Sequence, residues 1–302
     1  MEKIAINQHV HYSRIIQGFY RADQWGMTPQ EMNRFIHELV ERGVTTMDHA
    51  DIYGHYTVEG MFGKALALSP ALRDQLQIVT KCGIVQPNTI HPHQTAHRYD
   101  LSKIHIKRAV ERSLKELQVD YLDSLLIHRP SPLMQPCEIT DAVKDLVDEG
   151  KIRSFGVSNF KRAQYELLNR CLKDDKFHIA VNQIEISPHQ LIAFQDGTID
   201  DMQRENVKLM AWSPFAGGAL FQNDDQKGQR VMKELKRIAQ AHHTTVEAVV
   251  SAWFKKHPAQ IMPIIGTQQL ERLDRVIQGL DIELYDQEWF DIFTAAQGYD
   301  IP

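Results

Sequence analysis

The sequence predicts a single (β/α)8 TIM barrel of the α/β class over residues 1–302, with extra helices and a C-terminal tail. The length and the 43% hydrophobic content suffice for one large α/β domain. Short apolar or β-branched runs alternate with amphipathic helical stretches, as in parallel strands joined by crossover helices. Eight such runs can be counted, and eight parallel strands close into a barrel.

The eight expected strands are short. They cover residues 14–16, 45–48, 78–80, 124–127, 154–156, 180–183, 208–211 and 262–265. Active sites of such barrels lie at the carboxyl ends of the strands. The long gaps at residues 83–100, 129–139 and 213–229 are therefore expected to bind or gate a ligand.

The helices are recognised by their start and stop signals. Thr28, Pro29 and Glu31 indicate a capped start, and Gly43 indicates the end of that helix. Further amphipathic stretches cover residues 101–117, 140–149, 163–172, 231–242, 246–256 and 286–296. The consecutive pair before the last strand and the final stretch after it are additions to the eight repeated units.

Composition favours a small-molecule partner. The net charge of -5 comes from interleaved acids and bases, so no basic surface predicts nucleic acid or an anionic membrane. The start lacks an apolar signal core, and no run is long enough to span a membrane. Three cysteines, Cys82, Cys137 and Cys171, give neither a disulfide framework nor a zinc site, so we expect a cytoplasmic protein. Nothing demands assembly, and a monomer is expected.

The stretch MDHADIYGHY, residues 47–56, gathers titratable groups behind the second expected strand. Asp48, Lys81 and His128 each end a strand, and Tyr53 follows in the next loop. All four therefore belong to one end of the barrel. A tyrosine hydroxyl can protonate the oxygen of a carbonyl that accepts hydride.

These residue types suit that chemistry. The tyrosine pKa of about 10 needs tuning, and a nearby lysine ammonium would lower it. The Asp48 carboxylate would keep Lys81 charged and oriented, while His128 could donate a hydrogen bond to the carbonyl oxygen. Each residue alone has an ordinary structural explanation, such as a turn cap, a surface charge or a core histidine. Their coincidence at one end of the barrel favours catalysis.

This arrangement resembles the catalytic tetrad of the aldo-keto reductases: Asp48 and Tyr53-Gly54, Lys81 after QIVT, and His128 closing DSLLIHRP. The resemblance continues through GKIRSFGVSNF, VNQIEIS, LMAWSPFAGGAL and PIIGTQQLERL. It implies an enzyme that reduces aldehydes or ketones to alcohols by hydride transfer from NADPH, with Tyr53 as proton donor. No metal is implied.

The resemblance also implies a set of cofactor-binding residues. Ser158, Asn159 and Gln183 would bind the nicotinamide carboxamide, and Trp212 would stack on the nicotinamide ring. The pyrophosphate-side loop would comprise Ser213, Pro214, Phe215 and Gly217, and the adenosine end would comprise Gly266, Thr267 and Arg272. The family members with the best-known cofactor preference carry lysine at the position of Gly266, so one phosphate-binding charge is missing here. Arg272 still favours NADPH over NADH, because a guanidinium can pair with a phosphate through two hydrogen bonds.

Two further departures concern histidines. His49 replaces the threonine common after the aspartate, and a histidine-rich insertion contains His91, His93 and His97. The insertion could suggest a metal site, but a solvated loop is the better interpretation because no carboxylate or thiolate lies nearby.

Two rival functions stay open. A nicotinamide-binding regulator or sensor would keep the barrel with little turnover, although the intact tetrad argues against it. A Schiff-base enzyme would need Lys81 with a lowered pKa, which Asp48 would oppose.

Overall fold

The computed structural model describes residues 1–87, 93–172, 177–222 and 225–301. Within this part of the chain, eight strands form a closed barrel in the order β10-β11-β12-β3-β4-β5-β8-β9. This is the (β/α)8 fold that the sequence predicts. The chain divides into two compact units, Met1–Asn182 and Gln183–Pro302. The prediction of one domain over residues 1–302 stays a prediction.

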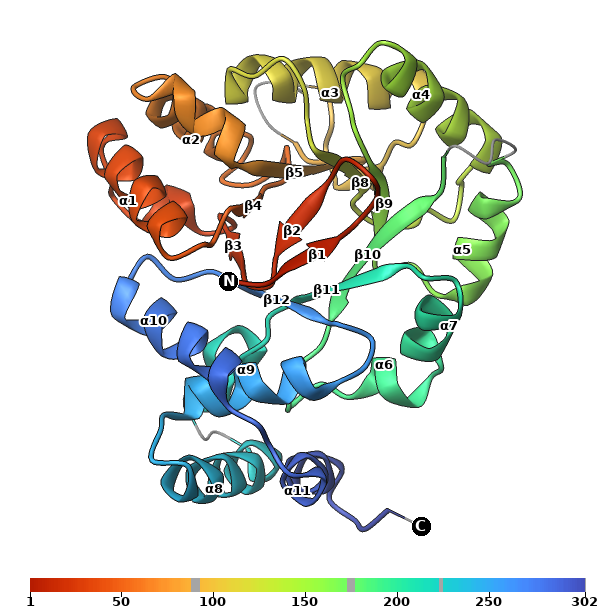
Figure 1. Ribbon diagram of the computed structural model, residues 1–302. Coiled ribbons are helices and arrows are strands. Elements are labelled where there is room, and N and C mark those ends of the chain that lie inside the picture. The colour runs from red at the N-terminus through yellow and green to blue at the C-terminus, as the bar shows by residue number, and fades with distance from the viewer. Residues whose placement is uncertain (88–92, 173–176, 223–224, 302) are drawn as a thin grey trace. The chain divides into compact units, whose positions relative to one another are not determined.

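The first unit alternates strands and helices. Its strands are β1 (Lys3–Ala5), β2 (His11–Ser13), β3 (Ile16–Gly18), β4 (Thr46–Asp48), β5 (Gln77–Cys82), β6 (Ile84–Val85), β7 (Arg98–Tyr99), β8 (Ser124–Ile127), β9 (Phe155–Ser158) and the first part of β10 (Ile179–Glu185). Its helices are the 3-10 helices η1 (Ala22–Gln24) and η2 (Pro70–Gln75), and α1 (Pro29–Glu41), α2 (Val58–Leu66), α3 (Lys103–Leu117), α4 (Pro136–Asp148) and α5 (Arg162–Asn169). In Figure 1, α1 to α5 lie outside the strands of this unit.

The antiparallel hairpin of β1 and β2 lies at the amino ends of the strands (Figure 1). Tyr12 is fully buried there, and its hydroxyl donates to Ser124 Oγ at the start of β8. Lys3 Nζ donates to Thr45 Oγ1, just before β4, at 2.6 Å. The hairpin therefore covers the end of the strands opposite the predicted tetrad.

Helix α1 begins as the sequence predicts. Thr28 Oγ1 accepts from the Glu31 N–H at 3.2 Å, and the Glu31 carboxylate accepts from the Thr28 N–H at 2.8 Å. Two of the backbone donors at the helix start are thus satisfied. The helix ends at Glu41, and Gly43 has φ 77°, the left-handed conformation expected of a terminating glycine.

Helix α2 does not appear among the predicted helices. Gly60 and Gly63 lower its helix propensity, yet they allow it to pack closely on α3. A Cβ atom on Gly63 would lie 2.0 Å from the Glu116 carbonyl oxygen, so only glycine fits this contact. Packing against α3 has overridden the weak local preference.

The second unit holds the rest of β10, β11 (Lys208–Trp212) and β12 (Met262–Ile265). Its helices are α6 (Ile192–Gln195), α7 (Thr198–Arg204), η3 (Ala216–Phe221), α8 (Gln226–Ala241), α9 (Val246–Lys256), α10 (Leu270–Gln278), η4 (Gly279–Asp281) and α11 (Asp286–Gln297). Helix α11 packs along α8 (Figure 1), and the Trp289 ring stacks on Trp253 of α9 at a centroid distance of 5.2 Å. The expected pair of helices before the last strand and the final helix are confirmed.

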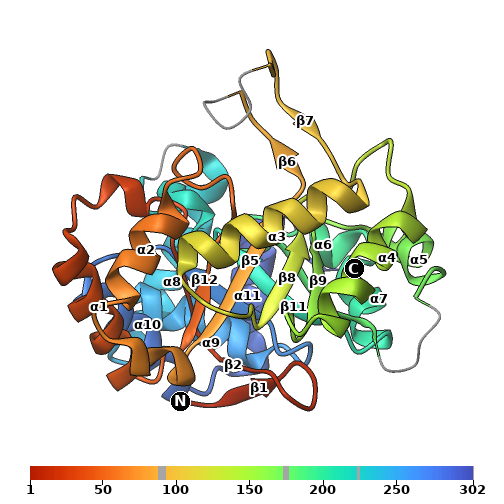
Figure 2. The same ribbon diagram turned by 90° about the horizontal axis from the view of Figure 1, so that it is seen from above.

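The expected loops contain more regular structure than predicted. Residues 83–100 include β6 and β7, which extend away from the other strands in Figure 2. Helix α4 begins at Pro136, so the predicted 129–139 gap is shorter than expected. The gap at 213–229 contains η3 and the start of α8. His91 of the histidine-rich insertion lies outside the described residues.

One expectation from composition is wrong. Cys137 at the start of α4 and Cys171 beyond α5 form a disulfide, while Cys82 is free and buried. Sequence spacing could not reveal this bond, because the two cysteines are 34 residues apart and meet only when α4 packs beside α5. None of the described helices is both long and apolar enough to cross a membrane.

Denaturing the protein without reductant should leave one reactive thiol, that of Cys82, and reduction should expose three. A disulfide that closes a loop of this length stabilises a folded protein by about 2–4 kcal/mol, so reduction should lower the free energy of unfolding by that amount. Thiol titration and urea unfolding measure both effects. Three reactive thiols before reduction would show that Cys137 and Cys171 are not joined.

Candidate active site

Three residues of the predicted tetrad lie at the carboxyl ends of three adjacent strands. Asp48 is the last residue of β4, Lys81 lies one residue before the end of β5, and His128 directly follows β8. These strands are parallel neighbours, with Asp48 paired to Val79 and Lys81 paired to Leu126. Their carboxyl ends therefore meet at one edge of the first unit.

Lys81 is the centre of this cluster. Its Nζ donates to Asp48 Oδ1 at 2.8 Å and Oδ2 at 2.9 Å, and to the His49 carbonyl oxygen at 2.6 Å. It also lies 3.0 Å from the Tyr53 hydroxyl oxygen. The Lys81 side chain has no exposed surface, and Asp48 and Tyr53 are also buried. The structure thus joins three of the four predicted residues by hydrogen bonds.

Burial and charge oppose each other at Lys81. Burial alone lowers the pKa of the ammonium, but the Asp48 carboxylate and the Tyr53 hydroxyl raise it more, so the pKa lies above its ordinary value. Lys81 is therefore a permanent cation at neutral pH. A lysine nucleophile needs the opposite shift, which removes the basis for the Schiff-base rival.

Tyr53 departs from the sequence expectation. Burial raises its pKa to about 12, and Lys81 lowers it by less than burial raises it. The net shift is upward because the phenolate would lose its hydration in this site. The Tyr53 hydroxyl consequently keeps its proton throughout the neutral range, as a proton donor requires.

His128 lies beside Tyr53, with the rings edge to face at a centroid distance of 6.1 Å. Burial, then the charges of Lys81 and Arg129, lower the pKa of His128 well below its ordinary value. The imidazole is therefore neutral and carries one N–H donor. Its Nδ1 has no hydrogen-bond partner within the described structure.

The His49 ring packs among aromatic side chains. It is fully buried, stacks on Phe19 at 4.6 Å, and meets Phe62 edge to face at 4.6 Å. Burial, then the charge of Lys81, lowers its pKa to about 3. Neither ring nitrogen has a hydrogen-bond partner in the described residues. The histidine that the sequence marked only as a departure thus acts as a neutral aromatic ring.

Ser158 and Asn159, the predicted carboxamide ligands of the first unit, lie at the end of β9. Asn159 Nδ2 donates to Ser158 Oγ at 2.8 Å, and Asn159 has φ 60°. This left-handed conformation is unusual for a residue other than glycine, although asparagine adopts it more readily than most. Parallel strands place these two residues at the same edge as the tetrad.

The remaining predicted cofactor residues belong to the second unit. Gln183 is in β10, where its Nε2 lies 3.9 Å from Met210 Sδ, and Trp212 ends β11. Ser213, Pro214, Phe215 and Gly217 follow Trp212 in the sequence, and Phe215 packs against Phe221 at 5.7 Å. Ser213 and Gly217 have φ 51° and 66°. A Cβ atom on Gly217 would meet nothing within 4 Å, so the loop leaves open space there.

Gly266, Thr267 and Arg272 form the last predicted group. Gly266 follows β12 and also borders open space, while Thr267 Oγ1 accepts from the Gln269 N–H at 3.1 Å. Arg272 is exposed in the first turn of α10. The exposed guanidinium of Arg272 is a group that can pair with a phosphate through two hydrogen bonds.

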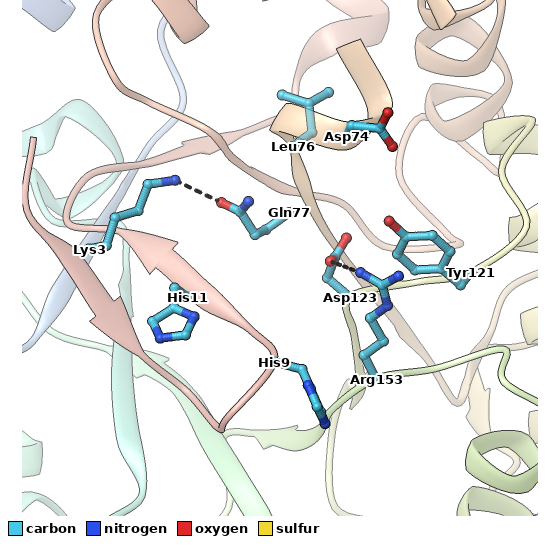
Figure 3. A pocket seen from close by; sticks show the side chains of 9 residues that line it. All are labelled: Lys3, His9, His11, Asp74, Leu76, Gln77, Tyr121, Asp123 and Arg153. Atoms are coloured by element: carbon cyan, nitrogen blue, oxygen red, sulfur yellow. Dashed lines mark hydrogen bonds and ion pairs between the residues drawn. The ribbon is translucent and has the colours of Figure 1, made fainter. Parts of the chain in front are cut away.

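A cavity of about 430 Å³ lies at the opposite end of the strands and contains none of the predicted site residues. Figure 3 shows the hairpin residues Lys3, His9 and His11 facing a second group of side chains across it. The remaining lining residues are Asp74, Leu76, Gln77, Tyr121, Asp123 and Arg153. Gln77 begins β5 and Asp123 precedes β8, so this cavity is separate from the tetrad.

A phenol held against a buried lysine–aspartate pair, at the carboxyl ends of strands in a (β/α)8 fold, has the groups that the reduction of a carbonyl needs for protonation. Comparison with known proteins identifies the family.

The sequence model of the aldo/keto reductase family matches residues 14–296 of the chain. The oxidoreductase YcsN of Bacillus subtilis is 44% identical over 303 residues, which cover 100% of both chains. A 6-dehydroglucose reductase of Agrobacterium fabrum is 38% identical over 302 residues, again 100% of both chains. A solved thermostable aldo-keto reductase, bound to the inhibitor epalrestat, has a TM-score of 0.78 at 26% identity and covers 98% of this chain and 100% of its own.

The chain belongs to the aldo/keto reductase family. It is an oxidoreductase of the class that acts on small carbonyl compounds, and the family uses nicotinamide cofactors. The resemblance inferred from the tetrad and the later motifs is confirmed at the level of family, fold and enzyme class.

The neutral His49 ring should make stability depend on pH. The pKa of His49 is about 3 in the folded protein, whereas an unperturbed histidine, as in the unfolded chain, has a pKa of 6.5. The unfolded chain therefore takes up a proton first as the pH falls. Stability should therefore drop as the pH falls from about 6.5 towards 3. Between pH 7 and pH 5 the free energy of unfolding should fall by about 2 kcal/mol through His49. A His49→Phe protein should lack this part of the pH dependence.

Urea unfolding at the two pH values measures the difference. His97→Gln, at an exposed histidine, is the matched control and should keep the wild-type dependence. Equal pH dependence in the wild type and His49→Phe would contradict a buried neutral His49.

Proposed function

We propose that the enzyme reduces aldehydes or ketones with NADPH, and that Tyr53 donates the proton. The observation that carries this proposal is the 3.0 Å contact between the Tyr53 hydroxyl and the buried Lys81 ammonium. NADPH, when bound, supplies the hydride that reduces the carbonyl carbon. The chain then has to bind the carbonyl oxygen, stabilise its developing negative charge and protonate it.

Tyr53 is suited to the protonation step. With a pKa of about 12 it is fully protonated at neutral pH, and the acceptor is an alkoxide, a stronger base. As the proton leaves Tyr53, the adjacent Lys81 charge stabilises the phenolate. Asp48 holds that charge in place through two hydrogen bonds.

His128 would orient the substrate. Its neutral ring can donate one hydrogen bond, and it lies next to the Tyr53 ring, from which the proton comes. A carbonyl oxygen that accepts hydrogen bonds from both Tyr53 and His128 is polarised before hydride arrives.

The NADPH-binding residues are proposed from the family resemblance. Ser158, Asn159 and Gln183 offer the donors and acceptors that a carboxamide needs. Trp212 offers an aromatic face for the nicotinamide. The pyrophosphate side is assigned to Ser213, Pro214, Phe215 and Gly217, and the adenosine 2'-phosphate end to Gly266, Thr267 and Arg272. The exposed Arg272 supports NADPH over NADH, although Gly266 supplies no charge.

The substrate is proposed to be an aldehyde of polar character. This rests on the relative named 6-dehydroglucose reductase, which matches the whole chain at 38% identity. Monomeric state and cytoplasmic location stay predictions. The cysteine count from which the location was argued gives it no support, because Cys137 and Cys171 form a disulfide.

Tyr53→Phe should bind NADPH like the wild type and lose carbonyl reduction by about 10²–10⁴-fold in kcat, because the proton donor is removed. Loss of NADPH absorbance with a panel of aldehydes, including 6-dehydroglucose, measures turnover, and cofactor fluorescence measures binding. Tyr20→Phe is the matched control, since Tyr20 meets the Tyr53 ring at 5.1 Å but is largely exposed.

Turnover by Tyr53→Phe at the wild-type rate would refute the role of Tyr53. NADPH binding by the wild type without turnover of any carbonyl in the panel would favour the sensor function instead. The ratio of kcat/KM with NADPH to that with NADH measures the cofactor preference.

A further inference from the structure

The turn that carries Tyr53 has a strained backbone. It links β4 to α2, and three consecutive residues, Gly54, His55 and Tyr56, have φ values of 54°, 54° and 71°. Glycine adopts this left-handed conformation freely, but in His55 and Tyr56 it is strained by the side-chain Cβ. Contacts from outside the turn must therefore stabilise it, and with it the position of Tyr53.

A single side chain of α3 contacts the turn on both sides of Tyr53. Arg112 donates from Nη2 to Asp51 Oδ2 at 2.9 Å. Its guanidinium also lies over the Tyr56 ring, 4.9 Å from the centroid. Arg112 is partly buried, with 22% of its side chain exposed, so solvent screens the ion pair only in part. We call these contacts of Arg112 with Asp51 and Tyr56 the Arg112 clamp.

Asp51 needs this partner. Its side chain has no exposed surface, and its Oδ1 accepts no hydrogen bond in the described structure. Burial, and then the charge of the buried Glu59, raise the pKa of Asp51 well above its ordinary value, and the Arg112 guanidinium opposes that rise. Loss of Arg112 would remove this hydrogen bond and charge partner from a fully buried carboxyl group, which destabilises its position. We therefore expect Asp51 to shift when Arg112 is lost.

One end of the clamp bonds to Lys81 in β5, and the other bonds to the segment at β6 that follows β5. The Asp51 N–H donates to the Lys81 carbonyl oxygen at 3.0 Å. On the other side, the Tyr56 hydroxyl donates to the Ile84 carbonyl oxygen at 3.4 Å and accepts from the Gln86 N–H at 3.1 Å. A shift of Asp51 or Tyr56 would therefore move the turn relative to β5 and lengthen the distance between Tyr53 and Lys81.

We propose that Arg112 is a positioning residue for proton transfer, which clamps Asp51 and Tyr56 and thereby holds the Tyr53 hydroxyl against Lys81 Nζ. It acts through the turn and not on the substrate. This inference rests on the proposed role of Tyr53. A displacement of about 1 Å at a reacting group can cost 10²-fold in rate, so the effect should be visible in kcat.

The test compares Arg112→Ala and Arg112→Lys with Arg108→Ala, an exposed arginine one turn earlier on α3. Arg112→Ala should lower kcat by about 10–10²-fold while the Kd for NADPH and the KM for aldehyde change by less than about threefold. Arg112→Lys should recover part of kcat, because an ammonium can still pair with Asp51. Arg108→Ala, which removes the same charge from the same helix, should match the wild type.

Amide hydrogen exchange gives a readout that needs no turnover. In Arg112→Ala the segment 51–57 should exchange faster, while β8 and α4 keep their protection. If the wild type reduces no carbonyl, the proposed function fails, and faster exchange confined to this segment would still support the clamp. If the wild type is active and Arg112→Ala keeps both its kcat and the protection of segment 51–57, the clamp is refuted.

A purely structural ion pair predicts a different pattern. Arg112→Ala would then lose melting temperature and protection throughout the first unit, with kcat per folded molecule unchanged, and that result would overturn the proposal. If Arg112→Ala does not fold, Arg112→Lys and Asp51→Asn carry the test. Both should show a selective loss of kcat, smaller in Arg112→Lys than in Asp51→Asn, and wild-type kcat in both would contradict the clamp.

Discussion

The candidate site depends on the buried ion pair between Lys81 and Asp48. An ammonium without exposed surface costs several kcal/mol to bury unless charge and hydrogen bonds offset that cost. Asp48 supplies the opposite charge, and the His49 carbonyl and the Tyr53 hydroxyl supply further oxygens. The same ammonium acts outward on its neighbours. After burial, it is the next cause that lowers the pKa of His49 and of His128, so both rings stay neutral.

This constraint explains how the first unit is built. Adjacent parallel strands bring Asp48 and Lys81 to the carboxyl ends of the strands. The hairpin of β1 and β2 covers the opposite ends, so it does not cover the site. Tyr53 comes from no strand and has to be brought to Lys81 by a turn with left-handed residues. Two contacts with α3 support that turn. Gly63 lets α2 approach α3 closely, and Arg112 of α3 donates to Asp51 in the turn. Proton transfer and packing are thus linked through one short segment.

The barrel and the tetrad could be predicted from the sequence, because the strands recur at regular intervals and the tetrad residues stand at or just after their ends. The strand expected at 14–16 lies at Ile16–Gly18, two residues later, and the strand at 262–265 is placed as predicted. Helix α2 was missed because its glycines serve a contact with α3 that no local propensity reveals. The upward pKa shift of Tyr53, the Cys137–Cys171 disulfide and the Arg112 clamp were missed for a related reason. Each depends on burial or on residues that meet only after folding.

The central claim is that Lys81 acts on catalysis through the Tyr53 phenol. A double-mutant cycle of carbonyl reduction, with Lys81→Met made in the wild type and in Tyr53→Phe, tests it most directly. We expect Lys81→Met to lower kcat by about 10²-fold or more in the wild type, but by less than about threefold when the phenol is already absent. Losses that multiply, so that Lys81→Met costs the same factor in both backgrounds, would show that the ammonium and the phenol act independently and would contradict this account.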